Sequence, residues 1–117
     1  MSEYPFLMYR SEDETVTVNA LIKYETVWLM QKAMAELFGV EPPAVNKHLK
    51  NIYSEGELQE NATVSKMEIV RQEGTGKVKR QVAFYNLDAI ISVGYRVNSR
   101  KATRFRIWAT GVLKGVA

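Results

Sequence analysis

The chain contains no cysteine, which excludes disulfides and thiolate metal sites. It also has no apolar run near the roughly 20 residues that a membrane-spanning helix needs, and no signal-peptide pattern at its start. These absences are compatible with a reducing cytoplasm, where we expect the protein, and they predict no membrane partner. The 117 residues, 46% of them hydrophobic, fit one domain with a modest core.

The net charge of +3 conceals an uneven distribution of charge along the chain. Residues 1–60 sum to −5, whereas residues 61–117 sum to +8. A basic half in a small protein favours a polyanionic partner. A surface charged only for solubility is the alternative, and charge by itself does not decide between the two.

Alternating, β-rich segments predict strands at residues 5–9, 16–22 and 26–29, with a polar turn at residues 11–14. Helical spacing predicts helices at residues 31–38, which Gly39 ends, and from Pro43 to about Tyr53.

Residues 63–85 alternate again and break at residues 73–77, which predicts a hairpin. Asn86 and Ser99 are expected to cap two further helices. Their predicted apolar faces are Leu87, Ile90, Ile91 and Tyr95, then Ala102, Phe105, Trp108, Ala109, Val112 and Leu113. The order predicts an α+β fold: N-terminal strands, a helix-turn-helix, a wing-like hairpin and two C-terminal helices, in a winged-helix-like arrangement.

The two central helices have the residues that a helix-turn-helix requires. Ala35 allows the second helix to cross closely, Gly39 suits the turn, and Val45 can fill the crossing. The second helix would then expose Asn46, Lys47 and Lys50, whose side chains can contact base edges or phosphate in a major groove. Helical hairpins in cores imitate this pattern, so the motif alone leaves DNA reading open.

The leading end of the second helix is less suited to DNA. Glu41 would repel phosphate, and Pro42 and Pro43 supply no N–H donors where helices commonly hold phosphate.

Two further groups of cations are candidate phosphate contacts. Those of the hairpin could bind the DNA backbone or could simply block edge pairing. Those of the last helix oppose its macrodipole, which points to an anionic ligand or to pairing with the acidic N-terminal half. The predicted residues are Lys77, Lys79 and Arg80 in the hairpin and Arg100, Lys101 and Arg104 in the last helix.

Nothing in the sequence points to catalysis, a cofactor, a metal or a small-molecule substrate. His48 is the only histidine and no nucleophile accompanies it, so a structural role or a groove contact is expected. The pattern Gly74-Thr-Gly76 lies in a polar turn, not between a strand and a helix as a nucleotide motif does. We therefore expect a protein that is not an enzyme.

Several stretches resemble the virulence RhuM family of bacterial proteins. The longest are residues 84–98, FYNLDAIISVGYRVN, and residues 105–110, FRIWAT, and shorter ones lie at residues 25–29, 34–38, 48–52 and 55–58. The arrangement is also similar to Bro-N-type domains of antirepressors, with Phe105 and Trp108 matching an aromatic pattern of their closing helix.

The resemblance implies a DNA-binding protein, of the transcription-regulator or antirepressor kind, with no agreed biochemical activity. The chain departs from the family in having Met30, which cannot N-cap, and in its residues 41–44, EPPA, where relatives are more polar. Family members continue past this C-terminus, so residues 1–117 are expected to be the N-terminal part of a longer architecture. Double-stranded DNA is the expected partner; a protein–protein module, including a homodimer, is the alternative.

Overall fold

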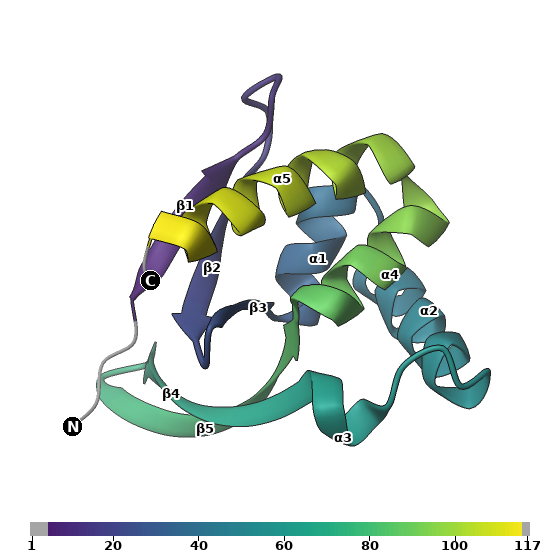
Figure 1. Cartoon of the computed structure of the whole chain (residues 1–117). Coiled ribbons are helices and arrows are strands. Elements are labelled where there is room, and N and C mark those ends of the chain that lie inside the picture. The colour runs from purple at the N-terminus through teal and green to yellow at the C-terminus, as the bar shows by residue number, and fades with distance from the viewer. Residues whose placement is uncertain (1–4, 116–117) are drawn as a thin grey trace.

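The computed structural model describes residues 5–115, which form one antiparallel sheet with helices on one face (Figure 1). The strands are β1 (Phe6–Arg10), β2 (Thr17–Lys23), β3 (Thr26–Leu29), β4 (Val64–Glu73) and β5 (Gly76–Asn86). The helices are α1 (Gln31–Phe38), α2 (Pro42–Ser54), α3 (Glu60–Thr63), α4 (Leu87–Val97) and α5 (Ser99–Gly115). The predicted α+β class is confirmed.

The sheet has the order β1-β2-β3-β5-β4, so the hairpin β4–β5 is joined to the N-terminal strands. Only two residue pairs, Trp28 with Asn86 and Leu29 with Tyr85, connect β3 to β5. The base of the hairpin is therefore part of the sheet, while its far end extends away from the helices along the bottom of Figure 1. The hairpin was predicted, whereas its place in a common sheet was not.

Alternation along the strands divides the sheet into two apolar faces. One face packs under α1, α4 and α5 and contributes residues such as Ala20, Val27 and Leu29 to the main core. The other face holds a smaller cluster of Leu21, Trp28, Met67 and Phe84. Because Leu21 and Trp28 contact residues of β4 and β5 there, the hairpin is packed against the sheet as well as paired with it.

Local signals set the end of α1 and the start of α4. Gly39 has a φ of 72°, the left-handed conformation that ends α1, and Met30 makes no side-chain cap, both as predicted. Asn86 caps α4 by accepting a hydrogen bond from the Ala89 N–H at 3.2 Å, also as predicted.

Two expectations from the sequence are corrected by the fold, and one element is added. Asn98, not Ser99, caps α5, because its side chain accepts from the Lys101 N–H at 3.1 Å. Tyr95 does not face the core and is 48% exposed. The core-facing side of α4 carries Val93 and Gly94, which are buried. The short α3 was not predicted, since four residues carry no helical period.

Three helices approach one another closely at Gly94. A Cβ added there would lie 2.6 Å from Cζ of Phe38 in α1 and 2.7 Å from Cβ of Ala102 in α5. No ordinary Cβ contact is that short, so a side chain larger than hydrogen would push the helices apart.

We expect Gly94→Ala to lower the free energy of unfolding by about 1–3 kcal/mol, because the added methyl overpacks this contact. Gly111→Ala is the matched control: it lies in the α5 interior with nothing within 4 Å of the added Cβ, so it should be neutral or stabilising by up to about 1 kcal/mol. Urea denaturation of both variants measures the difference. Equal stability of Gly94→Ala and the parent protein would contradict the close packing.

Candidate nucleic-acid interface

The α1–α2 pair presents one face of α2 to solvent. Ala35 and Val45 are buried between the helices, and the turn at residues 39–41 directs α2 across α1. The exposed positions recur at helical spacing: Pro43, Lys47, Lys50 and Ser54. Lys47 and Lys50 therefore lie on an open face and pair with no carboxylate of the described residues.

Asn46, the third residue predicted to contact a groove, lies to the side of this face. Its Nδ2 donates to Oε1 of Gln31 at 3.4 Å, and Nε2 of Gln31 donates to the Tyr85 hydroxyl at 2.9 Å. Asn46 is half-buried, so this network links α2 to the start of α1 and to β5. Its side chain would have to break the hydrogen bond to Gln31 before the amide oxygen and nitrogen could both hydrogen-bond to a base.

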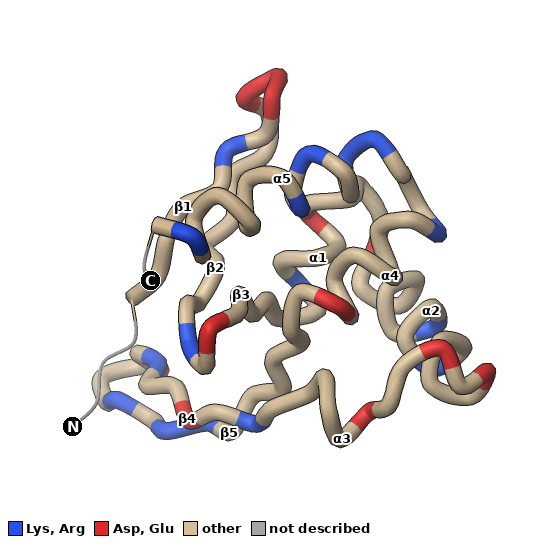
Figure 2. The backbone as a smooth tube through the Cα atoms, in the orientation of Figure 1, with Lys and Arg blue, Asp and Glu red and all other residues tan. Residues whose placement is uncertain are grey.

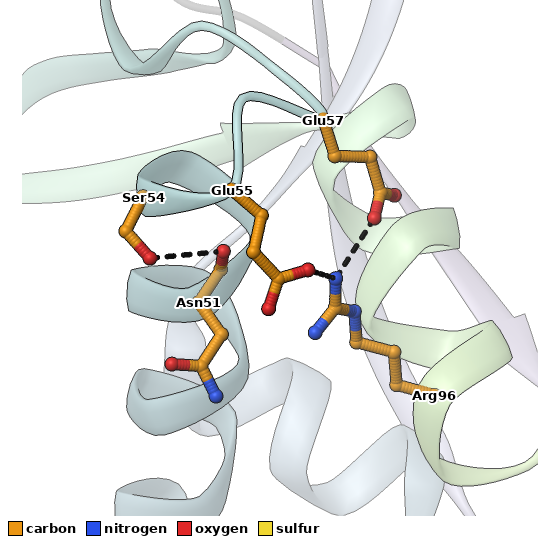
Figure 3. Close-up of polar contacts among 5 residues, drawn as sticks. All are labelled: Asn51, Ser54, Glu55, Glu57 and Arg96. Atoms are coloured by element: carbon orange, nitrogen blue, oxygen red, sulfur yellow. Dashed lines mark hydrogen bonds and ion pairs between the residues drawn. The ribbon is translucent and has the colours of Figure 1, made fainter.

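Arg96 holds the segment that follows α2. Its Nη2 donates to Oε1 of Glu55 and to Oε1 of Glu57, each at 2.9 Å (Figure 3). The hydrogen bond from Arg96 is the main reason that the pKa of Glu57 lies below its usual value. This clamp attaches the C-terminal end of α2 to α4 and engages the Arg96 cation in ion pairs at the surface.

The hairpin cations lie on opposite faces of the ribbon. Lys77 and Lys79 share the face of β5 that also carries Tyr85, whereas Arg80 is on the other face. Arg80 makes two hydrogen bonds to Glu73, at 2.8 and 3.1 Å, and these bonds lower the pKa of that carboxyl. Nζ of Lys79 lies 3.9 Å from Glu68, with both side chains largely exposed.

The cations of α5 meet the acidic turn between β1 and β2. Nε of Arg104 lies 3.1 Å and Nη2 of Arg100 3.8 Å from Oε2 of Glu12. The sequence left two possibilities for these residues, an external anion or the acidic N-terminal half, and the structure shows the second for Arg100 and Arg104. Lys101 is half-buried beside them and pairs with no described carboxylate.

The predicted phosphate contacts are not brought together into one patch. Figure 2 shows the cations of α5 at the top of the molecule, those of the hairpin at the lower left, and those of α2 at the right. The two glutamates that pair within the hairpin, Glu68 and Glu73, could have been found from the alternation of charge along it. The partner of α5, Glu12, could not, because it lies 88 positions before Arg100 in the chain.

Residues 5–115 contain no group of three or more His, Asp or Glu side chains that could hold a metal ion. His48 is half-buried on α2. No helix in the same range is long and apolar enough to cross a membrane.

The fold and its surface define a small α+β protein with a helix pair and separate basic groups. Residues 62–116 match the model of the Virulence protein RhuM family, which confirms the predicted resemblance to that family over this part of the chain. The match includes residues 84–98 and 105–110, and it begins after α1 and α2. No match was found among curated proteins or among solved structures.

Asp13 organises the turn that carries Glu12. Its Oδ1 accepts hydrogen bonds from the hydroxyls of Ser11 and Thr15, at 2.7 and 2.8 Å, and from the Thr15 N–H. These bonds, that from Ser11 first, lower the pKa of Asp13 from 3.8 to about 2. The turn is thus held by the ionised form of one side chain.

We expect Ser11→Ala and Thr15→Ala each to raise the pKa of Asp13 from about 2 toward 3.8, because each removes a donor to the carboxylate. Since the folded pKa is lower than the unfolded one, Asp13 should favour folding above pH 3.8 and lose that effect as the pH falls to about 2. An NMR titration of the side-chain carboxyl measures this pKa. Ser54→Ala, which removes a hydroxyl elsewhere, should leave it unchanged; a pKa near 3.8 in the parent protein would contradict the assignment.

Proposed function

We propose that the protein binds double-stranded DNA through α2, with α1–α2 acting as a helix-turn-helix and the β4–β5 hairpin as a wing. It would act as a transcription regulator or an antirepressor-like protein in the cytoplasm, without catalysis of its own. The observation that carries the proposal is the open face of α2, where Lys47 and Lys50 project without internal partners while Val45 anchors the helix beneath.

The geometry of the pair supports this use of α2. A groove-reading helix must be fixed rigidly, since contacts to base edges require a defined position. α2 is fixed along its length: Val45, Leu49 and Ile52 are fully or almost fully buried. At its end the Arg96 clamp holds residues 55 and 57.

The hairpin contributes phosphate contacts that do not depend on sequence. Lys77 and Lys79 are exposed on the face of β5 that carries Tyr85, and Tyr85 is joined to Asn46 of α2 through Gln31. Arg80 is already satisfied by Glu73, so its contribution would be smaller than that of a free cation. Glu41, Pro42 and Pro43 at the leading end of α2 oppose phosphate binding at that end, so the contacts of α2 would begin one turn later, at Lys47 and Lys50.

A second candidate function is self-association, for which β1 gives a specific reason. Phe6 and Met8 are 54% and 57% exposed. In the register with β2, the backbone N–H and C=O groups of Phe6 and Met8 face away from the sheet and pair with no described residue. An open apolar edge strand of this kind can pair with the same strand of a second copy.

We expect Lys47→Ala and Lys50→Ala each to weaken binding to random-sequence duplex and to reduce the slope of log K against log salt concentration by about 0.9, the effect of one lost phosphate contact. Lys114→Ala is the matched control, because Lys114 is an exposed lysine at the far end of α5. Fluorescence anisotropy with a labelled duplex at several salt concentrations measures these changes.

Binding that is indifferent to salt, or equal losses in all three variants, would contradict the assignment to α2. Size-exclusion chromatography of the same samples, with and without duplex, addresses the second candidate. A dimer that forms without DNA and is lost in Met8→Lys, but kept in Val70→Lys, would support self-association through β1; Val70 has a similar exposure of 59%.

A further inference from the structure

The turn between β1 and β2 places a carboxylate against the first turns of α5. Both Arg100 and Arg104 converge on the same atom, Oε2 of Glu12, at 3.8 and 3.1 Å. Figure 2 shows the acidic tip of this turn next to the basic start of α5. Two guanidinium groups around one oxyanion are the arrangement that binds phosphate in many proteins.

The turn presents Glu12 in a fixed position. Asp13 accepts three hydrogen bonds from Ser11 and Thr15, and the Ser11 hydroxyl accepts from the Val16 N–H at 3.0 Å. Glu14 has a φ of 61°, which closes the turn. Because the backbone is held by these bonds, only the Glu12 side chain needs to move for its carboxylate to leave the arginines.

An open cavity of about 480 Å³ lies between the turn and α5. Tyr9 and Leu37 form part of its apolar wall, and Asn98 and Lys101 add polar groups. Lys101 is directed toward the end of α1, since its Nζ lies 3.6 Å from where a Cβ on Gly39 would be. Glu12 and the three cations Arg100, Lys101 and Arg104 all line this cavity, so an anion bound in it would lie beside them.

The balance of charge in the cavity is unusual for a helix start. Three cations, Arg100, Lys101 and Arg104, lie where the macrodipole is already positive, which costs free energy. Of the two carboxylates in the cavity wall, Asp13 is held by the hydroxyls of its own turn, so Glu12 alone pairs with α5. If Glu12 leaves, three cations are available to one ligand.

We propose that Arg100, Lys101 and Arg104 form a phosphate-binding site that the Glu12 carboxylate occupies in the free protein, so that a phosphate enters by displacing Glu12. If the phosphate is that of duplex DNA, this inference rests on the proposed function. The site is separate from α2 and the hairpin, so it would receive a backbone segment other than the one beside α2. The acidic turn acts as an internal competitor that lowers affinity for weakly bound phosphates.

Inorganic tripolyphosphate is the first probe, because it carries phosphate without DNA. Its binding is followed by the NMR signal of the Arg104 Nε–H, which lies at the contact. We expect Glu12→Gln to bind tripolyphosphate about two- to fivefold more tightly than the parent, as loss of an exposed ion pair allows. Arg104→Ala, followed by calorimetry, should bind it more weakly.

Glu14→Gln is the matched control. It removes the same charge from the same turn, but Glu14 contacts Arg10 at 3.9 Å and neither arginine of α5. Glu12→Asp keeps the charge and shortens the side chain, so it should also tighten binding if displacement of the contact is the cause. Thermal unfolding of each variant checks that the protein still folds. If Glu12→Gln does not fold, Glu12→Asp provides the test in its place.

Equal tightening in Glu12→Gln and Glu14→Gln would show a general charge effect and overturn the proposal, as would no tightening in either Glu12 variant. A labelled duplex is the second probe. Tighter duplex binding in Glu12→Gln alone supports the DNA backbone as the natural source of the phosphate. If tripolyphosphate binds and duplex does not, the phosphate-binding site is supported and the proposed function is contradicted.

Discussion

The close approach of three helices at Gly94 is the contact on which the rest of the structure depends. Phe38, at the end of α1, and Ala102, in the second turn of α5, both occupy space that a side chain on α4 would take. α1 is therefore held at its C-terminal end, immediately before the turn that leads into α2. The position of the α2 face is set by this packing together with the Arg96 clamp at the other end of α2.

The same packing aligns α5 with the first strand. Tyr9 of β1 lies edge-on to Phe105 and Trp108 of α5, with ring centroids 5.0 and 5.1 Å apart. Because β1 runs directly into the acidic turn, this aromatic contact also places Glu12 near Arg104. The ion pairs are exposed and individually weak, so they follow from the apolar packing and do not create it. That is why a phosphate could replace Glu12 without disturbing the fold.

The uneven charge of the sequence has two different outcomes in the fold. Some cations of the basic half neutralise the acidic half: Arg96 contacts Glu55 and Glu57, and Arg100 and Arg104 contact Glu12. Others, such as Lys77, remain on open surface, as do Lys47 and Lys50 of the acidic half. Charge counted along the chain predicted a polyanionic partner, but it could not show which cations are already engaged, because their partners come from distant segments.

The sequence by itself determined the elements whose causes are local. The strand at residues 26–29 and the helix at residues 31–38 were predicted to the residue, since alternation, helical period and Gly39 act within one segment. The turn at Tyr24 and Glu25 was different. Both residues adopt φ values of 54° and 61° without being glycine, and the Trp28 indole N–H donates to the Lys23 carbonyl beside them. Only the tertiary structure decided the joining of the hairpin to the sheet, the engagement of Asn46 by Gln31 and the meeting of Glu12 with α5. Each of these depends on which distant surfaces pack together, and packing between segments leaves no period in the sequence of either one.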